Sequence, residues 1–166
     1  MSESQKPIFQ VSGFTDPVAI RVTGKANYLN CGSLRDFIDA MVLKGYKRFA
    51  LDLKNCTGMD STFMGILAGL AIKLNEQSPS GTVLLCNLNE HNDQLIHNLG
   101  LNKLLILDSE LCKQCEPNQP FTQLDNAEIS DAEKMLEAHE NLIKANKENS
   151  AEFEDVIAFL RNQINH

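Results

Sequence analysis

The sequence of 166 residues lacks the long apolar segments of a membrane protein. Apolar runs such as residues 49–53 and 83–88 are far shorter than the roughly 18 residues that a transmembrane helix needs. The polar start, residues 1–6, also lacks the apolar core of a signal peptide. We therefore expect a cytoplasmic protein that stays in the compartment where it is made and has no membrane span.

The sequence also has fewer basic residues than acidic ones. The chain has 15 Lys and Arg residues against 22 Asp and Glu residues, which gives a formal net charge of −7. Affinity for nucleic acid comes largely from clustered Lys and Arg side chains that contact phosphates. The balance argues against direct nucleic-acid binding and is compatible with a protein partner whose surface is basic or mixed in charge.

The five cysteines are an odd number with no disulfide-framework spacing, so we expect free thiols in a reducing compartment. Cys31, Cys56 and Cys86 lie in or beside apolar segments, which is typical of small core residues. Cys112 and Cys115 form a lone C-x-x-C without a second pair or a close His pair. This favours a plain surface pair over a redox site or half of a zinc site, and we expect no metal and no cofactor.

Common catalytic motifs are missing as well. No G-x-G-x-x-G, Walker A or G-x-S-x-G pattern occurs. His91 and His97 are six residues apart, His139 lies in a charged helical stretch, and His166 is terminal. None of these histidines has the spacing of a metal or catalytic pair, so we expect a protein that is not an enzyme.

What the sequence does contain is a regular alternation of strand and helix patterns. Strands are expected at residues 9–11, 18–23, 48–53 and 82–88, with a further apolar segment at 101–107 pairing with the sheet. Helices are expected at residues 33–43, from 60 or 61 to about 75, and 94–99. Parallel crossovers need helix-length connections. The sequence therefore predicts an α/β fold with a mixed, largely parallel sheet of about four or five strands and helices packed on it.

The composition divides the chain into three parts. Residues 1–111 form the predicted α/β domain, and the polar residues 112–128 are predicted as a linker or irregular segment. Residues 129–166 are predicted as an amphipathic helical extension of two helices, the first starting at Ser130. The second helix has an apolar stripe of Phe153, Val156, Ile157, Leu160 and Ile164. The stripe needs a partner surface, either the core domain or a second chain, and we slightly favour a homodimer through 129–166.

A polar turn links the strand at 48–53 to the long apolar helix. Asp60 and Ser61 stand where side-chain oxygens can accept hydrogen bonds from the first helical turn. Gly65 and Gly69 are four apart on one helix face and cost about 1 kcal/mol each by helix propensity. We therefore expect close packing of that face against another element. Taken alone, an Asp-Ser-Thr before a helix is more often a cap than a functional site.

The run Met59-Asp60-Ser61-Thr62, placed between a buried strand and a helix rich in small residues, resembles the STAS domain of bacterial anti-sigma factor antagonists. The resemblance covers about residues 8–107. It also includes Thr23-Gly24 at the end of the early strand, the helix from Ser33, and the apolar-Gly-Leu pattern of residues 95–101.

In that family, a serine after the aspartate is phosphorylated by an anti-sigma factor that is also a serine kinase, and the unphosphorylated form binds this partner. The resemblance implies that Ser61 is the acceptor and Thr62 a less favoured one. It implies a partner-binding surface of Asn27, Asp60, Ser61, Thr62, Phe63 and Met64. The implied partner is an anti-sigma factor/serine kinase, and a phosphatase acting on Ser61 is a further candidate partner that the sequence does not identify.

One position departs from the family pattern. Many members have Asp where this chain has Asn27, after Gly24 at the end of the early strand. Asparagine keeps the size and hydrogen bonding but loses the charge, so the partner of this loop can differ. A second hypothesis is a STAS accessory subunit of a membrane transport system that docks on its ATPase. The third and weakest is a small redox or metal protein built on Cys112 and Cys115.

Overall fold

A computed structural model describes residues 8–13, 15–114, 120–124 and 131–165 of the chain. The strands are β1 (Phe9–Ser12), β2 (Val18–Ala26), β3 (Arg48–Met59), β4 (Thr82–Cys86) and β5 (Thr122–Gln123). The α-helices are α1 (Gly32–Leu43), α2 (Ser61–Asn75), α3 (Glu90–Asn98), α4 (Ser109–Gln114), α5 (Ala132–Ala145) and α6 (Ser150–Ile164), with short 3-10 helices η2 (Leu101–Lys103) and η3 (Lys147–Asn149).

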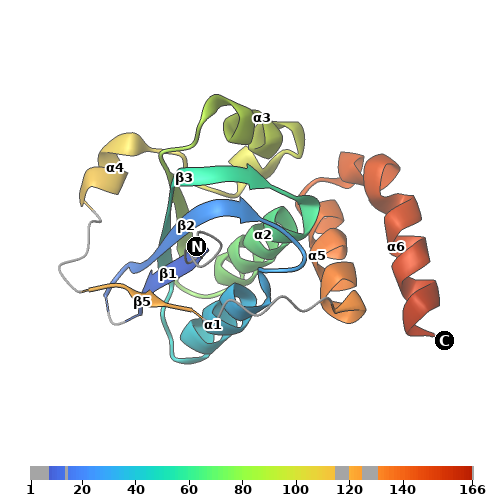
Figure 1. Cartoon of the computed structure of the whole chain (residues 1–166), viewed down its shortest axis with the longest axis horizontal. Coiled ribbons are helices and arrows are strands. Elements are labelled where there is room, and N and C mark those ends of the chain that lie inside the picture. The colour runs from blue at the N-terminus through green and yellow to red at the C-terminus, as the bar shows by residue number, and fades with distance from the viewer. Residues whose placement is uncertain (1–7, 14, 115–119, 125–130, 166) are drawn as a thin grey trace, which may run out of the picture.

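The five strands form one mixed sheet in the order β4-β3-β2-β1-β5 (Figure 1). The strands β2, β3 and β4 run parallel, whereas β1 is antiparallel to both β2 and β5. Ile106 adds a single parallel bridge to Leu84, so the apolar segment 101–107 meets the sheet at one residue. The predicted mixed α/β sheet with packed helices is confirmed.

The main core lies on one face of this sheet. Ile20, Leu51 and Leu85 are level on three neighbouring strands and are buried together with the apolar faces of α1 and α2. On the opposite face, Ala50 and Leu84 belong to a small separate cluster against which Cys112 of α4 packs. Alternate side chains of one strand point to opposite faces of the sheet. Because other elements cover both faces near the sheet centre, the side chains on both sides are apolar there.

The C-terminal extension packs back on the α/β core. Helix α5 lies beside α2, and α6 lies on the far side of α5 (Figure 1). Leu142 of α5, with Phe153 and Ile157 of α6, belongs to the same buried cluster as the sheet. Most of the predicted stripe is therefore covered within one chain, although Val156 stays 38% exposed. The reason for expecting a homodimer through 129–166, an apolar face without a cover, no longer applies.

The predicted linker, residues 112–128, contains more structure than its composition indicates. It holds the end of α4 and strand β5, in which Thr122 pairs with Val11. Residues 115–119 and 125–130, including the predicted helix start at Ser130, lie outside the described residues. The three-part division of the chain stays a prediction.

The expectation of free thiols is wrong for two cysteines. Cys86 at the end of β4 and Cys112 in α4 form a disulfide, with a Cα–Cα distance of 5.7 Å. The two cysteines lie 26 residues apart in the sequence and meet only because α4 packs against β4. Their spacing in the sequence therefore could not reveal the pair. Cys31 and Cys56 are buried and free, as expected. Cys115 lies outside the described residues.

Candidate functional site at the start of helix α2

The Asp60-Ser61 turn lies at the edge of the sheet where parallel strands end. Ala26, the last residue of β2, is level with Met59, the last residue of β3. The backbone N–H of Asp60 donates to the carbonyl oxygen of Ala26 over 3.1 Å. Because both strands end here, the loop after β2 and the N-terminus of α2 lie side by side.

Asp60 joins these two segments through its carboxylate. Oδ1 accepts a hydrogen bond from the backbone N–H of Phe63 (2.9 Å), which is the N-cap of α2. Oδ2 accepts one from the backbone N–H of Tyr28 (2.7 Å), in the loop after β2. The predicted cap is confirmed, and the same side chain also fixes the loop beside the helix.

Asn27 holds the turn of that loop. Its Oδ1 accepts hydrogen bonds from the backbone N–H groups of Leu29 (3.0 Å) and Asn30 (3.3 Å). In return, the backbone N–H of Asn27 donates to Oδ1 of Asn30 over 2.9 Å. An amide oxygen can accept these bonds as a carboxylate does. The loop thus keeps the hydrogen bonds that an aspartate would make while losing its negative charge.

Ser61, the predicted acceptor, is hydrogen-bonded to a residue of the extension. Its Oγ lies 2.7 Å from Nε2 of His139 in α5. Nδ1 of His139 lies 2.7 Å from the carbonyl oxygen of Met135. Because a carbonyl oxygen can only accept, Nδ1 carries the hydrogen, and in the neutral ring Nε2 accepts the Ser61 hydroxyl. His139 is only 3% exposed, and its ring packs against that of Phe153 in a T-shaped arrangement.

The glycine face of α2 is the surface on which α5 lies. A Cβ added at Gly65 would overlap the carbonyl group of Ala138, and one at Gly69 would overlap the side-chain amide of Asn141. The two helix backbones approach this closely only because both positions lack a side chain. The expected close packing of this face is confirmed, and the packed element is α5.

Three of the predicted partner-binding side chains are buried in this conformation. Thr62, Phe63 and Met64 all belong to the interior, and Phe63 stacks on Phe9 with ring centroids 6.3 Å apart. Asn27 and Asp60 are partly exposed. Their roles in partner binding stay predictions. Tyr28, which the sequence did not single out, is 42% exposed beside Asp60 and enlarges the accessible part of the site.

Cys31 directly follows the loop after β2, and its side chain is buried. Burial, and next the negative charge of Asp60, raise the pKa of its thiol from 9.0 to about 12. The thiol is therefore protonated at neutral pH, and a protonated thiol is a poor nucleophile and a poor metal ligand. Among the described residues, no group of three or more His, Cys, Asp or Glu side chains could hold a metal ion.

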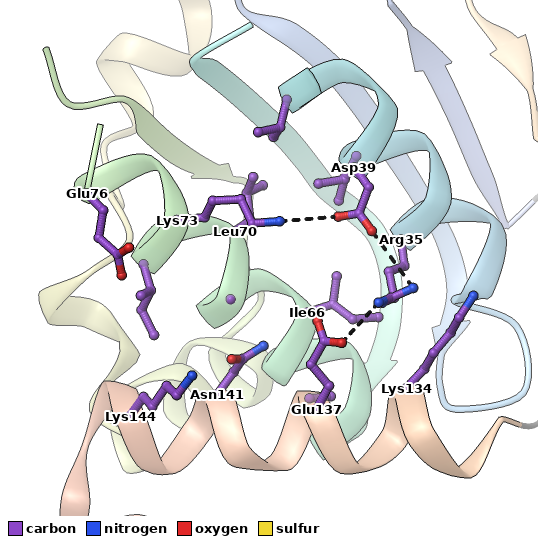
Figure 2. Close-up of a pocket in the computed structure, with 15 residues that line it drawn as sticks. Arg35, Asp39, Ile66, Leu70, Lys73, Glu76, Lys134, Glu137, Asn141 and Lys144 are labelled. Atoms are coloured by element: carbon purple, nitrogen blue, oxygen red, sulfur yellow. Dashed lines mark hydrogen bonds and ion pairs between the residues drawn. The ribbon is translucent and has the colours of Figure 1, made fainter. Parts of the chain in front are cut away.

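A pocket of about 300 Å³ lies between α1, α2 and α5, next to the glycine crossing (Figure 2). Two ion pairs lie among its charged side chains. Arg35 of α1 contacts Glu137 of α5 at 3.1 Å, and Lys73 of α2 contacts Asp39 of α1 at 3.9 Å. The first pair links α5 to the core, and the second links α2 to α1.

Sequence reasoning missed His139. It lies 78 residues from Ser61 in a charged helix, and nothing in its local pattern distinguishes it from a solvated side chain. The only indirect signal was the glycine face, which predicted a close neighbour for α2 without identifying it.

The STAS domain family matches residues 9–115. The match covers more than half of the chain, so the chain belongs to the STAS domain family. It ends before α5, which leaves both helices of the extension outside the matched region. No helix in the described part of the chain is long and apolar enough to cross a membrane.

Solved structures with the same fold include anti-sigma factor antagonists. SpoIIAA in its unphosphorylated form is 19% identical, with a TM-score of 0.52 over 64% of this chain and 96% of its own. The phosphorylated form of SpoIIAA, from Bacillus, is 20% identical with the same TM-score and coverage. A putative anti-sigma factor antagonist from Thermotoga maritima is 18% identical, with a TM-score of 0.54 over 64% of this chain and 93% of its own. No curated protein sequence matches.

Proposed function

We propose that this chain is a phospho-regulated anti-sigma factor antagonist of the cytoplasm, which acts by binding a partner and not by catalysis. In its unphosphorylated form it binds an anti-sigma factor that is also a serine kinase, and phosphorylation of Ser61 ends this binding. The observation that carries the proposal is the position of Ser61. It is the first residue of α2, directly after the capping Asp60, in a STAS fold similar to both forms of SpoIIAA.

The start of a helix suits a phosphoserine. The first-turn N–H groups and the helix dipole favour an anion, so the protein itself can tolerate the roughly −1.5 to −2 charges that a phosphoryl group brings. A partner packed over the same turn would have to desolvate or repel that charge. Losing such an interface contact costs about 2 to 5 kcal/mol, which is enough to weaken binding more than tenfold.

The transfer itself is ordinary kinase chemistry. The Ser61 oxygen forms a bond to the γ-phosphorus of ATP held by the kinase, the bond from that phosphorus to its bridging oxygen breaks, and ADP leaves. A base of the kinase takes the hydroxyl proton. The chain needs to supply only a hydroxyl group in a defined position.

The proposal is tested by purifying the full chain from its native cells with the proteins bound to it. Wild type and Ser61→Ala are expected to recover the same serine kinase, and Ser61→Asp at least about tenfold less of it. Recovery of the kinase at equal levels by all three chains, or recovery of a transporter ATPase in its place, would contradict the proposal.

A further inference from the structure

The extension contacts one residue of the site that the family resemblance assigns to the partner: Ser61, which is partly exposed, is hydrogen-bonded to His139 of α5. We infer that α5 is an internal cover for Ser61: while α5 lies on α2 it withholds the Ser61 hydroxyl from phosphoryl transfer, and a phosphoryl group on Ser61 displaces α5. This inference rests on the proposed function, since it concerns the regulation of the same serine.

Ser61 and His139 lie too close together to hold a phosphoryl group between them. Only 2.7 Å separates Oγ of Ser61 from Nε2 of His139, and His139 is buried. A phosphoryl group adds a tetrahedral phosphorus and three oxygens to Oγ. A group of that size does not fit between two atoms already at hydrogen-bond distance.

The contact between α5 and α2 is also close at Gly65 and Gly69. At Gly65, the backbone of α2 is already so near the carbonyl of Ala138 that a single methyl group would overlap it. One turn later, the end of the Asn141 side chain lies over Gly69, a contact that can adjust more easily than the backbone contact at Gly65. Packed interfaces of this kind change between discrete arrangements and do not deform gradually. Room for a phosphoryl group therefore requires α5 to lift from α2.

In an alternative response to phosphorylation, the Ser61 side chain would turn toward solvent while α5 stays in place. That rotation would break the hydrogen bond to His139 and leave Nε2 as a buried acceptor without a donor, which is costly. The ring cannot turn to a new partner without giving up its bond to the Met135 carbonyl. Lifting of α5 relieves both constraints because it takes His139 into water.

The two events are linked in both directions. If a phosphoryl group disfavours the docked helix, then docking shifts the phosphorylation equilibrium against the phosphorylated form by the same factor. The rate falls for a separate reason, because a kinase would act only on the minor population in which α5 is undocked. The extension, which lies beyond the family match, would thus make Ser61 a slower substrate than the same serine in a STAS domain without it.

The test is hydrogen exchange of the full chain, read peptide by peptide. Ser61→Glu places a longer acidic side chain at Oγ, and Ser61→Ala is the matched control that removes the hydrogen bond without adding bulk. We expect amides of α5 to exchange at least about tenfold faster in Ser61→Glu than in Ser61→Ala, with β2 and β3 unchanged. Equal protection of α5 in both variants would overturn the inference and favour rotation of the side chain toward solvent.

A second acidic variant covers the case in which Ser61→Glu does not fold. The side chain of Ser61→Asp is shorter than that of Ser61→Glu and still longer than serine. Faster exchange confined to α5 and α6 in Ser61→Asp, relative to Ser61→Ala, supports the inference, and unchanged exchange there overturns it. None of these measurements uses a kinase. Failure of the inference is therefore distinguishable from failure of the proposed function, which is read from partner recovery and from Ser61 phosphorylation in cells.

Discussion

Asp60 is the residue on which the geometry of the site depends most. One carboxylate oxygen caps α2 at Phe63, and the other holds the loop after β2 at Tyr28. We expect Asp60→Ala to lower the free energy of unfolding by about 2 kcal/mol, since it removes a helix cap and a second charge-assisted bond. Urea unfolding measures this. Asp60→Asn, which keeps the capping oxygen, should lose about half as much, and equal stability of the Ala variant and wild type would contradict this account.

Cys31 gives the site a measurable dependence on pH. Its pKa is about 12 in the folded chain against 9.0 as the ordinary value, so the folded state holds the proton more tightly. This contribution to stability is complete below pH 9 and is lost as the pH rises toward 12. Between these values the free energy of unfolding should fall by about 1.4 kcal/mol per pH unit from this residue.

The comparison with Cys31→Ala isolates that effect from other groups that titrate at alkaline pH. The slope of unfolding free energy against pH between 9 and 11 should be less steep in the variant, and an identical slope would show that the thiol is not shielded. At pH 8, Cys31 in the folded chain should also react with iodoacetamide far more slowly than Cys31 in the unfolded chain.

For single residues of the site, the sequence predicts a role in the structure only where the pattern is local. The cap at Asp60 and the position of Ser61 as the first residue of α2 both follow from a short run of neighbouring residues. His139 and the Cys86–Cys112 disulfide were missed because each joins segments far apart in the chain. Such pairs are set by how elements pack, and no spacing rule contains that information.

Among the elements, the crossing of α5 over α2 is the contact most sensitive to a single substitution. Gly65→Ala adds a methyl group that would overlap the Ala138 carbonyl. We expect a net loss of about 1–2 kcal/mol in the free energy of unfolding, because the overlap outweighs the gain in helix propensity. Hydrogen exchange should place the loss in α5 and α6.

Gly32→Ala is the matched control for this prediction. Gly32 begins α1, and a methyl group there would have no neighbour within 4 Å. Its stability should change by no more than about 0.5 kcal/mol. If both variants behaved alike, the close approach of α5 to Gly65 would be contradicted.

The helices and strands that could be predicted are those with a regular pattern of apolar residues. The parallel strands and the helices α1 and α2 bury apolar residues at regular spacing, so the sequence predicts where they start. Strand β3, however, continues to Met59 through the residues predicted as a polar turn. Strand β5 was not predicted, since it has two exposed residues and exists only by pairing with β1. Helix α3 starts four residues earlier than predicted because Asn89 caps it, accepting from the N–H of Asn92 over 2.7 Å.

For the whole molecule, the disulfide ties the far face of the sheet to α4. It closes a loop of 26 residues between Cys86 and Cys112. We expect its reduction to lower the free energy of unfolding by about 3 kcal/mol, because the open loop gives the unfolded chain more freedom. Urea unfolding with and without dithiothreitol measures the difference, and Cys112→Ala should be as unstable without reductant as the reduced chain. No effect of reductant on wild type would contradict the pairing.

The overall architecture combines a core that the sequence predicted with an arrangement that it did not. Alternating strands and helices are enough to predict the α/β sheet, because each parallel crossover needs a helix. Whether an amphipathic extension covers its own core or a second chain depends on the shape of the receiving surface. Here that surface is the glycine face of α2, and its use by α5 brings the extension to Ser61.

The central claim is that Ser61 is a phosphorylation switch, and the most direct measurement is the intact mass of the full chain recovered from its native cells. The mass should be recorded before and after phosphatase treatment, for wild type and for Ser61→Ala. The account predicts a gain of one phosphoryl group that phosphatase removes and that the variant never shows. Absence of the modification under all growth conditions, or its persistence in Ser61→Ala, would contradict the claim.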